Sequence, residues 1–366
     1  SLSLRGWEVK LKFYPTQSLA SQPGRLFKSP WALYKEVVLM EIIKIEGPHE
    51  QLQMKEKNRS KDWNVNIIFP SKPIPPEMLA LKDLEAWLRK WSEVFPKERT
   101  LAWVYYGVPS LIVRIDYVIN SSDNQKVYIY EIEDSPAGIG LASEVVPRFK
   151  EKMSELGWEE VTVIIPQKEK GGDDYLWTHV AEDLVSIRTP WVAPRIAVPP
   201  NLQERSIWPV VFREDKEYLQ ELGLAERWGG KISLEAKVNE YANKRKSAGV
   251  VFKSHGARAE RVKIVAFKKM IKETKEWLGT TGGIGIWTLG SIKEEIQKWD
   301  PLYIQPLYPP FKFLINGIRM YGIFRVYYGF SVNQGRYIPL GGFINTRPSL
   351  LIHGATDAYF VPISVP

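Results

Sequence analysis

Three carboxylates in two neighbouring strand-like segments, Asp116, Glu131 and Glu133, are the residues best suited to chemistry in this sequence. Segments 111–119 and 126–133 are rich in β-branched and aromatic residues, and the polar turn between them predicts a β-hairpin. Side chains alternate along a strand, so the three carboxylates are expected on one face. Like charges repel there unless a cation holds them, and oxygen ligands suit Mg²⁺. The sequence therefore predicts a magnesium site.

The register of this hairpin decides how the charges meet. If Ile119 pairs with Lys126, Asp116 lies diagonal to Glu131 and Arg114 lies directly opposite it. The alternative to a metal site is a solvated face with an Arg114–Glu131 ion pair.

A turn of small residues, 135–140, follows the hairpin and could let the backbone approach a ligand closely. The whole segment resembles the metal-binding end of ATP-grasp enzymes, where an R-x-D strand precedes an E-x-N-x-x-P segment. Asp116 and Glu131 match this pattern, and Glu133 stands where the family usually has Asn. The resemblance implies ATP and Mg²⁺ as cofactors, with these three carboxylates as metal ligands.

The position of the hairpin indicates a rearranged chain order. In an ordinary ATP-grasp enzyme the hairpin lies near the C-terminal end of the catalytic region, whereas here it lies within the first 140 residues. The chain therefore resembles the circularly permuted branch that includes glutathionylspermidine synthase. This resemblance implies a mixed α+β fold in which two lobes clasp ATP, with a Rossmann-like element near 161–209.

Two later segments resemble parts of the nucleotide lobe. Residues 248–253 resemble the strand that ends in a phosphate-contacting lysine, here Lys253. Residues 303–307 resemble the hinge whose backbone groups read the adenine edge, so Gln305 and Leu307 are expected at the nucleotide. The alternatives are a solvated lysine at a strand end and an ordinary strand before a proline turn.

Two loops are candidates for covering the phosphates. The segment 254–261 carries Arg258, and the glycine-rich run 280–286 carries Gly282 and Gly283. The choice between them stays open.

Residues 319–325 resemble the strand that crosses the floor of the family's site, and 341–347 resemble the end of the permuted family, so the resemblance implies three arginines as candidate catalytic groups. Arg319 and Arg325 are six residues apart on a predicted strand and share a face, and Arg347 lies near the polar Asn345. Such cations would neutralise a phosphoryl group during its transfer. His353 is expected to be a packed, hydrogen-bonded histidine.

The resemblance implies an ATP- and Mg²⁺-dependent ligase that joins a carboxylate to an amine, or to a thiol, through an acyl phosphate. The substrates would be small-molecule or peptide carboxylates and amines. The alternatives are a kinase of the same fold and a non-catalytic nucleotide-binding protein.

Composition narrows the remaining function classes. The chain has 366 residues, 44% hydrophobic and 25% charged, with no cysteine and four scattered histidines. The lack of cysteine excludes disulfides and thiolate metal sites, and the scattered positions of the histidines disfavour a multi-histidine zinc site. The net charge of +8 is typical of a solvated basic surface or of a field that attracts anions. No apolar run of about 18 residues, signal segment or nucleic-acid motif is visible, so we expect a cytoplasmic protein without a membrane or nucleic-acid partner.

The expected elements follow from periodicity and from turn residues. Helices are expected at 77–95, 143–156, 217–224, 232–246, 268–278 and 291–299, the last opened by a capping box at Ser291. Further strands are expected at 161–166, 250–253, 262–267, 302–307, 319–330 and within 341–365. We expect five parts: 1–72, mixed and without an assigned role; 73–156, the first part of the catalytic lobe; 157–215, the Rossmann-like, substrate-side element and linker; 216–310, the nucleotide-binding lobe; and 311–366, strands that complete the catalytic lobe.

Overall fold

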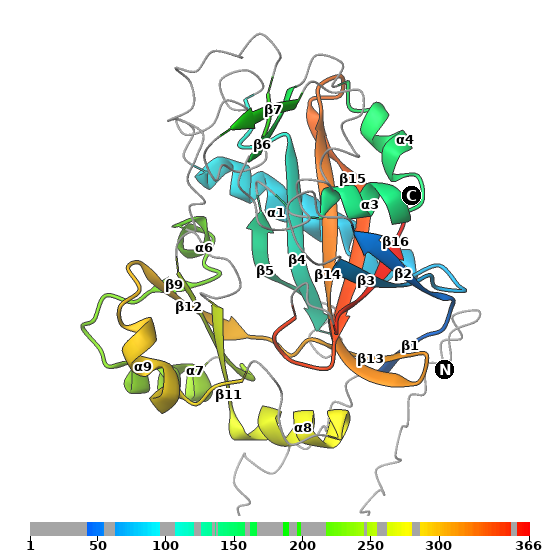
Figure 1. The fold of residues 1–366 in the computed structure, drawn as a ribbon. Helices are drawn as coiled ribbons and strands as arrows, with labels where there is room; N and C mark the ends of the chain where they lie inside the picture. The colour runs from blue at the N-terminus through cyan, green and yellow to red at the C-terminus, as the bar shows by residue number, and fades with distance from the viewer. Residues whose placement is uncertain are drawn as a thin grey trace, which may run out of the picture.

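The fold is mixed α+β and contains three sheets within the part of the chain that can be described (Figure 1). The computed structural model describes residues 42–54, 63–95, 107–120, 126–133, 136, 138–157, 162–166, 186–189, 196–198, 217–244, 247–254, 262–279, 286–352 and 357–366. No helix among these residues is long and apolar enough to cross a membrane.

The largest sheet is built from strands at both ends of the described chain. Its order is β1-β13-β14-β15-β16-β3-β2, and β4 pairs with β14 on one edge and β5 on the other. The strands are β1 (Ile42–Ile45), β2 (His49–Met54), β3 (Trp63–Ile68), β4 (Ile112–Asn120), β5 (Lys126–Glu133), β13 (Phe311–Ile315), β14 (Ile318–Ser331), β15 (Arg336–Arg347) and β16 (Tyr359–Ile363). The prediction that the acidic hairpin packs beside the C-terminal strands is therefore confirmed.

The long strand β14 is the branch point of this sheet. Along one edge its first residues pair with β13 and its later residues with β4, while β15 follows the other edge. Glycine is required where β14 and β15 approach closely: a Cβ on Gly342 would lie 1.9 Å from the carbonyl oxygen of Arg325. Gly341, with φ +113°, adjoins the register shift opposite Tyr327 and Tyr328.

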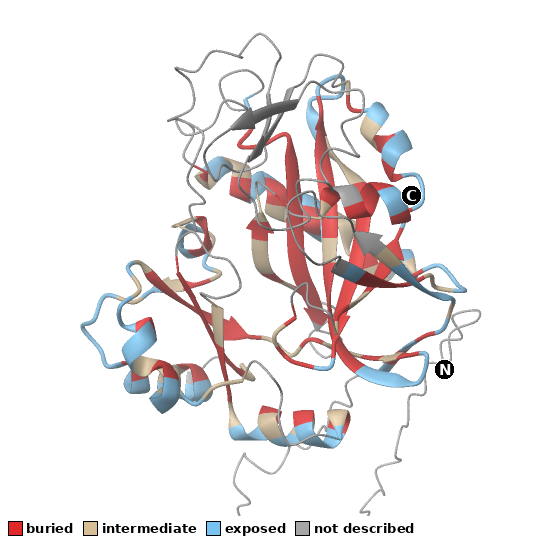
Figure 2. Ribbon diagram, viewed as in Figure 1, coloured by how far each residue is buried: buried red, intermediate tan, exposed pale blue. Residues whose placement is uncertain are grey.

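Helices cover both faces of the large sheet. The apolar face of α1 (Leu81–Val94) packs on one side, and α3 (Ile139–Val145) and α4 (Phe149–Ser154) pack on the other. Their sheet-facing residues and the sheet interior are buried, as Figure 2 shows. The single helix expected over 143–156 is wrong. Pro147 lacks an N–H donor and clashes with a continuing helix, so the chain divides there into two short helices.

The second sheet has the order β11-β10-β12-β9, all antiparallel. Its strands are β9 (Glu226–Arg227), β10 (Gly249–Ser254), β11 (Val262–Ala266) and β12 (Leu302–Leu307). The helices of this region are α6 (Glu217–Glu221), α7 (Leu234–Lys244), α8 (Lys268–Leu278) and α9 (Leu289–Ile296). These strands and helices confirm the elements expected between 217 and 307.

One boundary in this region corrects a prediction. Thr288, not Ser291, caps α9: its hydroxyl oxygen accepts a hydrogen bond from the Ser291 backbone N–H at 3.3 Å. The helix begins earlier than expected because Leu289 packs in the apolar cluster with Ile292 and Ile296.

A small third sheet joins β6 (Thr162–Pro166), β7 (Ser186–Thr189) and β8 (Ile196–Val198). The β6–β7 pair is parallel and the β6–β8 pair antiparallel. The Rossmann-like assignment stays a prediction, since residues 167–185 lie outside the described chain. The five-part division also stays a prediction, although strands from within 1–72 lie in the large sheet.

Candidate functional site

The acidic hairpin pairs one residue closer to its turn than expected. Asn120, not Ile119, is opposite Lys126. A slip of one residue would by itself turn the carboxylates of the two strands to opposite faces. A β-bulge, in which Tyr130 is the extra residue, restores the phase.

With the bulge in place, Asp116 lies opposite Glu131 and Arg114 lies opposite Glu133. The predicted register, with Arg114 opposite Glu131, is therefore wrong. The expectation that the acidic groups share a face is confirmed: one carboxylate oxygen each from Asp116, Glu131 and Glu133 lies within 4.8 Å of the other two.

Two guanidinium groups partly neutralise these carboxylates. The Arg114 Nε and Nη2 atoms donate to the two oxygens of Asp116 at 2.7 and 3.1 Å, and Nη2 also donates to Glu133 at 2.6 Å. Arg325 of β14 places its Nε 3.2 Å from Asp116 Oδ2. Both Asp116 oxygens thus contact guanidinium groups.

Burial and charge shape the ionisation of this cluster. Burial raises the pKa of Glu133 to about 7, with Arg114 opposing the shift and Glu131 and Asp116 reinforcing it. Burial lowers the pKa of Arg114, but its two carboxylate partners raise it by more, so the guanidinium stays charged. The cluster holds three acidic and two basic groups, which leaves a net negative charge when all are ionised.

The second sheet meets the outer edge of β5 at this point. The Lys253 ammonium donates to the carbonyl of Tyr130 at 2.6 Å, and the Gln305 side-chain amide donates to the carbonyl of Ile129 at 2.9 Å. Two successive carbonyls, that of Ile129 and that of the bulge residue Tyr130, therefore accept hydrogen bonds from the second sheet. Tyr130 also donates its hydroxyl to the carbonyl of Tyr308.

The predicted nucleotide residues of β10 and β12 therefore lie beside the acidic hairpin. Lys253 and Gln305 are both buried, and Gln305 Oε1 has no hydrogen-bond partner among the described residues. The Leu307 carbonyl accepts from the Ala248 N–H at 2.8 Å. The nucleotide-binding roles of Lys253, Gln305 and Leu307 stay predictions.

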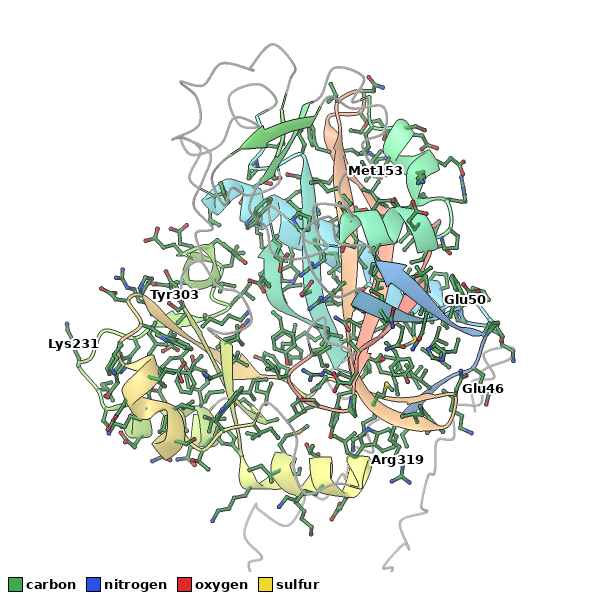
Figure 3. The ribbon with its side chains drawn as sticks, viewed as in Figure 1. Glu46, Glu50, Met153, Lys231, Tyr303 and Arg319 are labelled. Carbon is green, nitrogen blue, oxygen red and sulfur yellow. The ribbon has the colours of Figure 1, made fainter. Side chains whose placement is uncertain are left out.

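The three candidate arginines lie in different surroundings. Arg325 alone contacts the acidic cluster. Arg319 lies beside α8 (Figure 3). Its guanidinium lies over the Trp277 ring and donates to the Trp277 carbonyl at 3.2 Å. Arg347 pairs with Asp357 at 2.6 Å. The structure does not bring Arg319 to the carboxylates, and Arg347 is turned towards its own partner.

Tyr327 is a residue of the cluster that sequence reasoning missed. It is opposite Arg114 in the β14–β4 ladder, and burial raises the pKa of its hydroxyl to about 12. Its position two residues after Arg325 puts both on one face, so strand alternation was the available signal. Arg258, Gly282, Gly283 and His353 lie outside the described residues.

Comparison with known proteins adds little to this geometry. No protein-family model and no curated protein sequence matches the chain. Among solved structures, a glutathione synthetase-like effector from Globodera pallida, in its apo form, is similar with a TM-score of 0.34 and 9% identity. The similarity covers 81% of this chain and 89% of that one. A similarity this low does not establish a shared fold or activity.

Proposed function

We propose that this chain binds ATP and Mg²⁺ between its two larger sheets and joins a carboxylate to an amine or thiol, in a circularly permuted arrangement of the ATP-grasp type. One observation carries the proposal. Asp116 of the β4–β5 hairpin meets Arg325 of β14 on one side, and Lys253 and Gln305 of the second sheet contact the same hairpin on the other. Segments far apart in sequence thus bring acidic, basic and amide groups to one place.

The donor set suits a hard cation, because every candidate ligand atom is a carboxylate oxygen. Glu131 and Glu133, which are partly exposed, would hold Mg²⁺ directly. Asp116 would join them by exchanging one guanidinium contact for the cation. Bound there, Mg²⁺ would neutralise charge on the phosphate oxygens.

The residues of the chain would then bind and orient the reactants. A substrate carboxylate oxygen attacks the γ-phosphorus, the bond to the ADP oxygen breaks, and an acyl phosphate forms. The amine nitrogen then attacks the acyl carbon, loses a proton, and displaces phosphate with the bonding electron pair. Lys253 and Arg325 would neutralise the phosphates, with Arg347 as a further candidate, and Gln305 with the Leu307 backbone would contact the adenine.

This chemistry needs no cysteine or histidine nucleophile, in keeping with a chain that has no cysteine. Transfer to a hydroxyl would instead make the protein a kinase. A non-catalytic role is favoured by one observation: Asp116 and Lys253 already have partners within the protein, as in a structural buried ion-pair network.

The test is calorimetric titration of the full chain with Mg²⁺ and a non-hydrolysable ATP analogue, in wild type and in Glu131→Gln. Wild type should bind the analogue only with Mg²⁺, and the variant should lose that dependence. Glu144→Gln is the matched control, since Glu144 is exposed in α3 and pairs with Lys150. Equal Mg²⁺-dependent binding by wild type and Glu131→Gln would refute the site.

Product analysis then separates the activities. A ligase releases ADP only when both acid and amine are present, a kinase needs one acceptor, and a binding protein releases none.

A further inference from the structure

The side-chain amide of Asn345 in β15 is fully buried, and neither its Oδ1 nor its Nδ2 atom has a hydrogen-bond partner among the described residues. Buried polar groups in folded proteins are nearly always paired, because an unpaired one loses its hydration and gains nothing in return. An amide with both ends unpaired therefore indicates a partner outside the described residues, and a bound ligand is one that fits both ends.

The neighbours of Asn345 in the sheet cannot supply that partner. It lies opposite Ile323 of β14 and Phe360 of β16, both apolar. By strand alternation it shares its face with Arg347, two residues along, and with Arg325, on the adjacent strand. Asn345 is thus the neutral member of a face that carries two guanidinium groups.

The chain that follows β15 returns over this face. Arg347 donates to the carbonyl of Leu351 at 3.1 Å, and Arg325 Nη2 lies 3.5 Å from the carbonyl of Ile352. Ile352 also packs in the same apolar cluster as Ile323. Two neutral carbonyls therefore occupy guanidinium donors that a charged carboxylate would bind more strongly.

We propose that Asn345 and Arg325 form the subsite for the carboxylate substrate, which accepts the phosphoryl group. We propose further that this carboxylate has an adjacent N–H donor. The carboxylate would replace the Ile352 carbonyl at Arg325 and accept from Nδ2, while the N–H would donate to Oδ1. Both an amino acid and a peptide C-terminus have this chemistry. The inference rests on the proposed function, since Arg325 joins the subsite to Asp116 and hence to the proposed metal site.

The test uses Asn345→Leu, which keeps the approximate shape and removes both polar atoms. The metal- and nucleotide-free variant should unfold at a higher urea concentration than wild type, because two unpaired buried groups are gone. Its affinity for Mg²⁺ and the ATP analogue should not change. Its affinity for N-acetylglycine, the probe for a peptide terminus, should fall roughly tenfold to a hundredfold.

Three further probes define the ligand. N-acetylsarcosine keeps the carboxylate but has a methyl group in place of the N–H, so wild type should bind it more weakly than N-acetylglycine. Glycine reports on a free amino acid, and acetate on a carboxylate alone. Thr346→Val is the control variant: Thr346 is the next residue and its hydroxyl donates to the Tyr359 carbonyl at 3.0 Å, so its loss should lower stability and leave probe binding unchanged.

Several results would overturn the inference. They are a less stable Asn345→Leu variant, equal binding of N-acetylglycine by variant and wild type, equal binding of N-acetylglycine and N-acetylsarcosine by wild type, or no binding of any probe. Failure of the proposed function has a different signature, namely no Mg²⁺-dependent binding of the ATP analogue by wild type.

Discussion

Replacing Arg114 by methionine tests whether the acidic cluster is built around a cation. The Nη2 atom of Arg114 donates both to Asp116 and to Glu133, at 3.1 and 2.6 Å. It therefore occupies the position of a cation that bridges these two carboxylates. Methionine keeps the apolar length of the side chain and removes the charge.

The expected loss of stability without metal is large. Arg114 and Asp116 are each only 4% exposed, so the variant removes a buried cation from Asp116 and Glu133 and leaves Arg325 beside Asp116. Removing one partner of a buried ion pair typically costs about 3–5 kcal/mol. A divalent cation that binds only the folded state at a hundredfold excess over its Kd would restore about 2.7 kcal/mol.

The assay is urea unfolding of wild type and Arg114→Met, each in EDTA and in saturating Mg²⁺. The variant should gain more from Mg²⁺ than wild type gains, because the cation takes over the bridging position. Arg148→Met is the control: Arg148 pairs with Glu151 on the surface, so its loss should change little and add no Mg²⁺ dependence. An equal effect of Mg²⁺ on wild type and Arg114→Met would show that Arg114 does not stand in a cation position.

Three other perturbations follow from the structure. Lys253→Met should weaken binding of the ATP analogue by about 1.5–3 kcal/mol, measured by calorimetry. Lys263→Met, on the neighbouring strand, should not weaken it, and equal losses in the two variants would refute a specific contact between Lys253 and the nucleotide. In the folded protein Glu133 has a pKa of about 7, against 4.5 when free, so the folded state retains a proton that the unfolded state releases. The stability contributed by Glu133 in EDTA should be full below about pH 4.5 and be lost as the pH rises through 7, and a Glu133→Gln variant with the same urea-unfolding pH profile would refute this. Gly342→Ala should destabilise by about 1–3 kcal/mol or more, because its Cβ meets the Arg325 carbonyl, whereas Gly229→Ala, with open space around it, should not; equal unfolding midpoints would contradict the argument.

Much of the fold was accessible from sequence because local patterns suffice for it. The 3.6-residue spacing of Leu84, Leu88 and Trp91 predicts α1, and these residues are its buried face. The polar turn after Asn120 predicts the hairpin, and both strands end within one residue of the expected positions. Such signals lie within a few residues of the element that they predict.

The pairing within the site was less accessible. A bulge at Tyr130 has no local signal, because Tyr is an ordinary strand residue. The register expected without a bulge therefore placed the carboxylates on the correct face but opposite the wrong residues of the other strand. The environments of Arg319 and Arg347 depend on Trp277 and Asp357, and no periodicity relates an arginine to a partner on another element.

The branch at β14 also has a consequence for how the protein is made. The β4–β5 hairpin is complete at residue 133, but its partner strand begins at Ile318, about 185 residues later. At roughly 5–20 residues per second, the ribosome needs about 10–40 s to synthesise that interval. During this time the open edge of β4 could pair with another nascent chain. Arg114 and Asp116 lie along that strand, and charged residues on an edge strand discourage such pairing. The groups proposed to serve the finished site would thus also protect the hairpin from aggregation during translation.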